Sequence, residues 1–131
     1  MEVRLGSLVR DAQEARGTAI IIDVFRAFTT AAIAFDHGVK EVTLVAEPEE
    51  DGKRPEGFDF GNSPYEISQA DLASKTLVQS TRAGTVGVAA AVNASEIYLG
   101  SFVVAQATVN AIKKDGPELV SIIAMGDQGV N

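Results

Sequence analysis

The feature that most constrains the fold is an apolar run, within residues 20–30, that ends on a carboxylate and continues into a helix. Three consecutive isoleucines are typical of a strand buried on both faces, as at the centre of a parallel sheet. Asp23 therefore falls at the carboxyl end of that strand. Alanine and phenylalanine then recur at helical spacing up to His37 and Gly38, which predicts a helix after a tight turn. Open α/β folds bind ligands at such strand ends.

Two charges in this turn allow two interpretations. Arg26 falls in the first turn of the predicted helix, where the helix dipole disfavours a cation by roughly 0.3–1 kcal/mol. Either Arg26 pairs with Asp23 or extends into solvent, or Asp23 holds a divalent metal while Arg26 and the helix amides face an anion such as phosphate. The sequence alone leaves both interpretations open.

The composition limits the chemistry that this site can use. The 131 residues are 46% hydrophobic with a mean hydropathy of +0.11, so we expect one α/β domain over residues 1–131 with a real core. Cysteine is absent and His37 is the single histidine, which argues against disulfides, thiolate chemistry, histidine-rich metal sites and Ser-His-Asp triads. Chemistry based on oxygen ligands remains.

Charge and hydropathy also narrow the expected partners and location. The formal net charge of -7 argues against a nucleic-acid partner. No apolar run reaches membrane-spanning length without charged residues or glycine, and the N-terminus has no signal-peptide pattern. We therefore expect a cytoplasmic protein without a membrane partner.

Strand and helix signals alternate along the chain, which predicts a three-layer α/β/α sandwich around a mostly parallel sheet. The expected strands are residues 1–5, 18–24, 39–45, 75–80, 95–100 and 119–125, and the expected helices are about 7–16, 26–36, 65–72, 86–92 and 103–113. The helix at 26–36 and its two flanking strands are predicted to form a right-handed βαβ unit.

The segment 46–64 lacks this periodicity, and connections of this length are usually functional or disordered. Phe58 and Phe60 could anchor it on the body of the protein. The polar side chains between and after them would then face the strand ends: Asp59, Asn62 and Ser63. Alternatively, Asn62 or Ser63 simply caps the helix that follows.

A second strand, polar turn and helix occur at residues 75–92. The turn contains Gly84 and Arg82 and three hydroxyl side chains, from Ser80, Thr81 and Thr85. Glycine allows backbone amides to approach a phosphate and hydroxyls can donate to it, so this turn is a candidate phosphate cradle. The signal is weak, because neither a Walker loop nor GxGxxG is present. Residues 126–131 resemble another such loop without its helix, which leaves two alternatives: the N-terminal part of a longer protein, or a short paralogue.

Four motifs resemble the 2-phosphosulfolactate phosphatase family, the magnesium-dependent enzymes of coenzyme M biosynthesis and their bacterial relatives. They are IDVFRA followed by TT at 22–30, GFDFGNSP at 57–64, STRAGT at 80–85 and GSF at 100–102. Leucine is usual in the family where this chain has Phe25 and Phe60, and some members have Asn at the position of Ala83. Family members are also roughly twice as long.

The resemblance implies a three-layer α/β/α fold, a Mg²⁺ ion and hydrolysis of the phosphate ester of a small sulfonated or carboxylated hydroxy acid. The residues themselves agree with this chemistry, and Asp23 and Asp59 are the expected catalytic residues. Asp23 is the expected metal ligand, and Asp59 is the candidate for a second metal ligand or for positioning the attacking water. The residues implied to bind the phosphorylated substrate are Arg26, Asn62, Ser63, Thr81, Arg82, Gly84, Thr85 and Ser101. The alternatives are a non-catalytic anion-binding domain and a fragment that folds only with its other half. A homo-oligomer is a further expectation.

Overall fold

The computed structural model describes residues 1–45, 59–81 and 83–126, along which strands and helices alternate. The strands are β1 (Glu2–Ser7), β2 (Gly17–Ile22), β3 (Glu41–Val45), β4 (Thr76–Ser80), β5 (Ala94–Gly100) and β6 (Leu119–Ala124). The helices are α1 (Leu8–Glu14), α2 (Ala27–Asp36), α3 (Pro64–Gln69), α4 (Gly84–Ala90) and α5 (Ala105–Asp115), the last preceded by a 3₁₀ turn, η1 (Phe102–Val104). All pairs of strands are parallel, so the predicted α/β class is confirmed.

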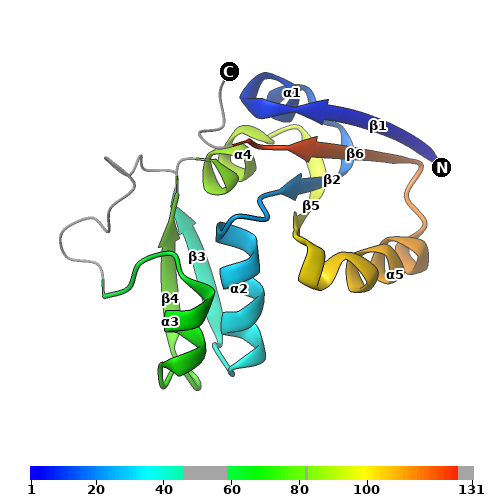
Figure 1. Cartoon of the computed structure of the whole chain (residues 1–131). Helices are drawn as coiled ribbons and strands as arrows, with labels where there is room; N and C mark the ends of the chain where they lie inside the picture. The colour runs from blue at the N-terminus through cyan, green and yellow to red at the C-terminus, as the bar shows by residue number, and fades with distance from the viewer. Residues whose placement is uncertain (46–58, 82, 127–131) are drawn as a thin grey trace.

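The main sheet has four strands in the order β1-β6-β2-β5 (Figure 1). The isoleucine run forms β2, which lies between β5 and β6 as expected of a central strand. Ile22 is in register with Gly100 on β5 and with Ala124 on β6. Because these strands are parallel, their carboxyl ends meet at one edge of the sheet, directly before Asp23.

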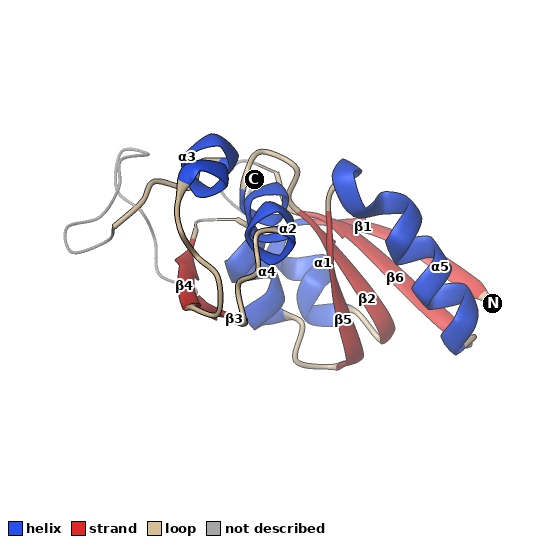
Figure 2. Ribbon diagram, turned by 90° about the horizontal axis from the view of Figure 1, so that it is seen from below, coloured by secondary structure: helices blue, strands red, loops and turns tan. Residues whose placement is uncertain are grey.

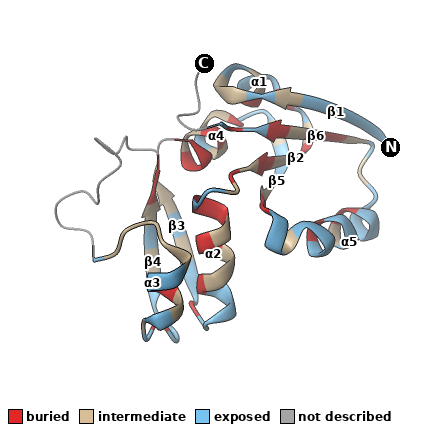
Figure 3. Ribbon diagram, in the orientation of Figure 1, coloured by how far each residue is buried: buried red, intermediate tan, exposed pale blue. Residues whose placement is uncertain are grey.

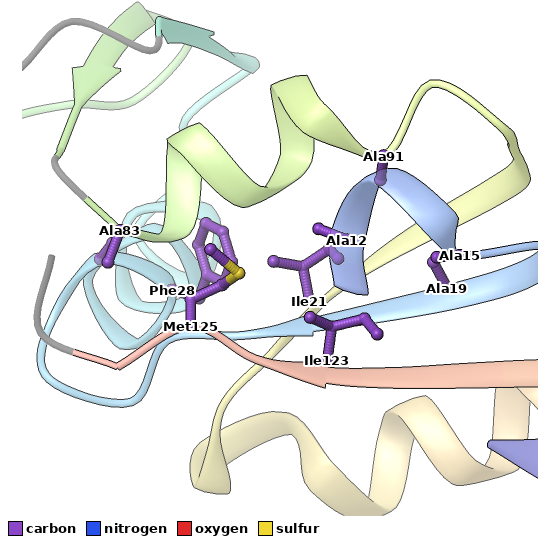
Figure 4. Packing of buried hydrophobic residues seen from close by; sticks show 10 residues of the cluster. Ala12, Ala15, Ala19, Ile21, Phe28, Ala83, Ala91, Ile123 and Met125 are labelled. Carbon is purple, nitrogen blue, oxygen red and sulfur yellow. The ribbon is translucent and has the colours of Figure 1, made fainter. Parts of the chain in front are cut away.

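Helices cover both faces of this sheet. Figure 4 shows α1 and α4 on the face where the main core lies, and α5 on the opposite face. The core combines alanines of the helices, their ends and β2 with larger side chains, which are Ile21 on β2, Phe28 on α2, Ile123 on β6 and Met125 directly after β6. The predicted three-layer α/β/α arrangement is therefore confirmed around the main sheet.

The predicted βαβ unit is wrong in its pairing. β3 does not lie beside β2; it pairs with β4 in a separate two-stranded parallel sheet, with Val45 in register with Ser80. The physical reason is that β2 has only two edges, and β5 and β6 occupy both. Figures 1 and 2 show β3 and β4 with α2 and α3 beside them, apart from the main sheet.

A second, smaller core joins α2 and α3 to the two-stranded sheet. Its buried residues are Ala34, Val39, Ile67 and Leu72, and the ring of Phe60 packs against them. The expected anchoring role of Phe60 is thus confirmed, whereas Phe58 lies outside the described residues. In Figure 3, buried residues are frequent at the start of α2 and in α4, whereas β1 is mostly exposed.

Several helix ends differ from the sequence-based expectation by one to three residues, and three of them bear on the caps and turns. α1 follows Ser7 but ends at Glu14, α3 ends at Gln69, and α4 begins at Gly84, within the turn that the sequence had placed before it. Ser7 does not cap α1 with its side chain; its N–H donates to the Asp11 carboxylate at 2.8 Å. Among the described residues, no helix is long and apolar enough to cross a membrane.

Candidate functional site

Asp23 is fixed between β5 and the start of α2. Its N–H donates to the carbonyl of Gly100 at 3.1 Å, and its own carbonyl accepts from the N–H of Phe28 at 3.2 Å. These bonds are what a parallel strand and a tight turn require at this position. The residue is only 8% exposed, so its carboxylate lies at the carboxyl end of β2 with little access to bulk water.

The Asp23 carboxylate reaches the start of α4. Its Oδ2 accepts the N–H of Gly84 at 2.9 Å, and Gly84 is the first residue of that helix. A Cβ atom on Gly84 would lie 2.7 Å from Asp23 Oδ2 and 2.8 Å from Cζ of Phe28, so this close approach requires glycine. The negative charge of Asp23 is also stabilised here by the positive end of the helix dipole.

Thr81 and Thr85 form an interlocked pair beside Gly84. The Thr85 hydroxyl accepts from the N–H of Thr81 at 3.0 Å and donates to the carbonyl of Thr81 at 2.8 Å. The N–H of Thr85 in turn donates to Oγ1 of Thr81 at 3.2 Å, and the two hydroxyl oxygens are 3.1 Å apart. Both residues are buried. In this structure the hydroxyls of these two threonines are thus bonded within the protein and stabilise the first turn of α4.

Arg26 lies in the turn between Asp23 and α2 and is exposed. Within the described ranges, ion pairs join Glu2 to Arg4 and Arg10 to Glu14, and none joins Asp23 to Arg26. The predicted ion pair between these two residues is therefore wrong, whereas the exposed Arg26 agrees with the alternative in which it extends into solvent. Arg82, the other arginine assigned to the phosphate, lies outside the described residues.

Ser101 lies at the same edge of the sheet, directly after β5. It is buried, and its Oγ has no hydrogen-bond partner among the described residues. Its neighbour Gly100 bonds to Asp23, so Ser101 and Asp23 lie on adjacent strand ends. A buried hydroxyl without a partner is uncommon and is a feature seen at functional positions.

The cleft, a cavity of about 380 Å³, lies between α2, α3 and the two-stranded sheet. Its polar lining includes Asp59, Asn62, Gln79 and Ser80, and its apolar lining includes Phe60 and Leu77. Asp59 is exposed, and Asp23 does not line the cleft. Ser63 caps α3, because its Oγ accepts the N–H of Glu66 at 3.3 Å, which confirms the capping alternative for Ser63.

The structure thus divides the predicted site residues into two groups. The strand-end group is Asp23, Thr81, Gly84, Thr85 and Ser101, and the cleft group is Asp59 and Asn62. In the part of the chain that the structure describes, no three acidic, histidine or cysteine residues gather as metal ligands.

Gln79, which the sequence analysis overlooked, connects the two groups. Its Nε2 donates to the carbonyl of Ala27 at 2.7 Å and to Oδ1 of Asn62 at 3.0 Å. Ala27 is the first residue of α2, which begins just after the Asp23 turn. The one available signal was an amide side chain within the largely apolar run 77–80.

A parallel sheet flanked by helices, with a buried carboxylate at the carboxyl ends of its central strands, is the open α/β architecture, in which ligands commonly bind at that edge. The family model described as 2-phosphosulpholactate phosphatase matches residues 7–51 and 48–130. The chain belongs to that family.

Curated relatives agree with this assignment. A probable 2-phosphosulfolactate phosphatase of Bacillus subtilis is 34% identical over 112 residues, which cover 72% of this chain and 49% of the relative. Proteins described in the same words are 30% identical in Clostridium novyi and 32% identical in Thermus thermophilus. Those matches cover 86% and 84% of this chain, and 55% and 53% of the relatives. The chain therefore spans about half the length of the curated relatives it matches.

Proposed function

We propose that this chain takes part in hydrolysing the phosphate ester of a small sulfonated or carboxylated hydroxy acid, of which 2-phosphosulfolactate is the type. The observation that carries the proposal is the buried Asp23 carboxylate at the joint carboxyl ends of β2 and β5, fixed against the start of α4. Family membership and the names of the relatives support the same reaction class.

In this proposal the residues have separate tasks. Arg26 is exposed beside the Asp23 turn and supplies positive charge to the phosphate, together with Arg82. The buried hydroxyl of Ser101 donates to the substrate from the adjacent strand end. Asp59, at the cleft, orients the attacking water. The phosphate replaces none of the bonds between Thr81 and Thr85, which keep α4 in place.

A magnesium ion forms part of the proposal, and the buried carboxylate of Asp23 is a suitable ligand for it. Magnesium in phosphate chemistry commonly uses one or two carboxylates and completes its shell with phosphate oxygens and water. Asp23 is the residue that would hold it, because its carboxylate is buried at the strand ends, where open α/β folds bind ligands. When bound, the ion would neutralise charge that develops on the phosphate.

A non-catalytic anion-binding domain is the second candidate. One observation favours it: the first amides of α4 already donate to Asp23 and Thr81, which leaves fewer preorganised donors for a transition state. In this case Arg26 and the hydroxyl of Ser101 hold a phosphorylated metabolite without turning it over.

Phosphate release from a panel of phosphorylated hydroxy acids, with magnesium and with chelator, separates the two candidates. Hydrolysis that requires magnesium and is lost in Asp23→Asn supports the phosphatase, with the exposed Asp36→Asn as the matched control. A rise in melting temperature with the same compounds, but without phosphate release, supports the binding domain instead.

A further inference from the structure

We propose that Asn62 presents its side-chain NH₂ group to the anionic part of the substrate, and that Gln79 is the positioning residue that orients it. This inference rests on the proposed function, because it takes the ligand to be a small phosphorylated acid. It adds a residue, Gln79, and an orientation of the Asn62 amide, with its nitrogen toward the ligand. Neither the motifs nor the relatives assign these.

The orientation follows from which groups can donate and which can only accept. The carbonyl of Ala27 only accepts, so the Gln79 atom 2.7 Å from it must be the nitrogen. That nitrogen has a second hydrogen, which goes to the Asn62 atom 3.0 Å away, and this atom must then be the oxygen. A backbone carbonyl thus fixes two amide side chains in series. The assignment therefore does not depend on a choice between amide flips.

The second consequence concerns the other end of Asn62. Because its Oδ1 accepts from Gln79, its Nδ2 carries two N–H groups, and neither is bonded to another residue in the described part of the chain. Asn62 is half-buried and lines the cleft. Phosphate, sulfonate and carboxylate oxygens are the acceptors that such an amide suits.

The backbone on both sides of Asn62 is also held in place. The N–H of Gly61 donates to the Glu66 carboxylate at 3.2 Å, and Ser63 caps the N–H of Glu66 at 3.3 Å. This reciprocal arrangement ties residues 61–63 to the first turn of α3. The side chain of Asn62 is then held to α2 through Gln79, so its donors are preorganised and a ligand need not order them.

Gln79 itself gives up a hydrogen bond in this arrangement. Its Oε1 is buried and has no partner among the described residues. An unpartnered buried carbonyl is unfavourable, and a hydrophobic residue on β4 would avoid it. Orientation of Asn62 would explain why a polar side chain, that of Gln79, occupies this position.

The decisive substitution is Gln79→Glu, which keeps the size of the side chain and removes its donors. The introduced carboxylate cannot donate to Ala27, and it draws the NH₂ of Asn62 toward itself, so that Oδ1 faces the ligand. The matched control is Gln106→Glu, because Gln106 donates to Asn110 at 2.9 Å in a similar pair on the exposed face of α5.

The readout is the Asn62 side-chain NH₂ resonance in NMR spectra during titration with inorganic phosphate and, separately, with methanesulfonate. We expect a saturable shift in the unmodified chain and in Gln106→Glu, and an affinity about tenfold weaker in Gln79→Glu. Asn62→Asp has no side-chain NH₂ group, so its affinity is measured from the backbone amide resonances of Gly61 and Ser63. It should keep the bond from Gln79 and the melting temperature, yet lose about tenfold in affinity for either anion.

Several results would overturn the proposal. They are an Asn62 NH₂ resonance that neither anion shifts, a Gln79→Glu variant that binds as tightly as Gln106→Glu, and an Asn62→Asp variant with unchanged affinity. The last result decides the matter if Gln79→Glu does not fold. Phosphate release with an unresponsive Asn62 would retain the proposed function and reject this inference. A responsive Asn62 without phosphate release would do the reverse.

Discussion

The carboxylate of Asp23 and the backbone N–H of Gly84 are 2.9 Å apart, although 61 residues separate them in the chain. The bond ties the end of β2 to the start of α4 and satisfies one of the helix amides that lack a partner within the helix. Asp23 therefore contributes to the fold as well as to the proposed site. Substitutions there must be measured for stability and for activity separately.

Asp23→Asn should lower the free energy of unfolding by about 1 kcal/mol when a chelator is present. The amide oxygen still accepts from Gly84, but the charge that favours the helix dipole is lost. Asp23→Ala should cost about 2 kcal/mol, because the helix amide then loses its partner. Denaturant unfolding with magnesium and with chelator measures both effects. If Asp23 holds the ion, any magnesium-dependent gain in stability disappears in both variants, and a gain that persists would contradict that role.

Gly84→Ala should destabilise the protein by about 1–3 kcal/mol, even though alanine favours helices. The added methyl would lie 2.8 Å from Cβ of Asp23 and from Cζ of Phe28, inside van der Waals contact with both. Thermal unfolding of Gly84→Ala and Gly61→Ala tests this. The nearest atom to a Cβ at Gly61 is 3.6 Å away, so that variant should unfold close to the unmodified chain. Equal melting temperatures for the two variants would count against the close approach.

Thr85→Val should cost about 1–3 kcal/mol of stability, because the N–H and the carbonyl of Thr81 both lose their partner. The exposed Thr76→Val is the control for the change in side-chain type. If Thr85 acts only within the fold, substrate binding should weaken no more than partial unfolding explains. A rise in KM at unchanged stability would instead show that Thr85 contacts the phosphate of the substrate.

The pKa of Tyr98 should lie above its ordinary value of about 10. The main cause is the hydrogen bond from its hydroxyl to the Asp115 carboxylate at 2.9 Å, which favours the neutral phenol. Because the folded pKa is raised, this contribution to stability is complete below pH 10 and is lost as the pH rises through the folded value.

Ultraviolet titration of Tyr65→Phe measures this pKa, since Tyr98 is then the remaining tyrosine of the two in the sequence. Adding Asp115→Asn should lower the pKa toward its ordinary value. No change on adding that substitution would show that the bond does not form in solution.

We expect the chain to self-associate through the apolar surface next to its strand ends. Phe25 is 90% exposed after β2 and Phe102 is 80% exposed after β5, and the two strands are neighbours in the sheet. Exposed apolar side chains that follow neighbouring strand ends are typical of interaction surfaces. Light scattering should show a lower apparent mass for Phe25→Ser with Phe102→Ser. Val92→Ser, an exposed position before β5, should leave the mass unchanged.

Local signals in the sequence were enough to predict the elements. The three isoleucines at 20–22 indicate a strand that is buried on both faces. Glycine and serine residues then indicate where the helices begin and end. The location of β3 could not be predicted in this way. Its pairing with β4 depends on which strands occupy the edges of β2, and that competition is between segments far apart in the chain.

The site shows the same limit at the level of side chains. A glycine with flanking threonines has the same signature whether it cradles a phosphate or caps a helix, because both use the same amides and hydroxyls. Thr81 and Thr85 bond to each other here, and only coordinates could reveal it. Gln79 was overlooked for a similar reason, since its partners, Ala27 and Asn62, are distant in sequence.

The division of the strands between two sheets affects how the molecule opens. β2 has hydrogen-bonded neighbours on both edges, whereas β3 and β4 pair only with each other among the strands that the structure describes. A pair of strands without further neighbours is marginally stable by itself, and such regions reach locally unfolded states at lower free energy than a central sheet. The cleft with Asn62 is lined by residues of this smaller unit. We therefore expect local opening of the cleft to cost less free energy than separation of the strands at the Asp23 edge. Ligand exchange at the cleft would then be governed by fluctuations of β3, β4 and α3 rather than by global unfolding.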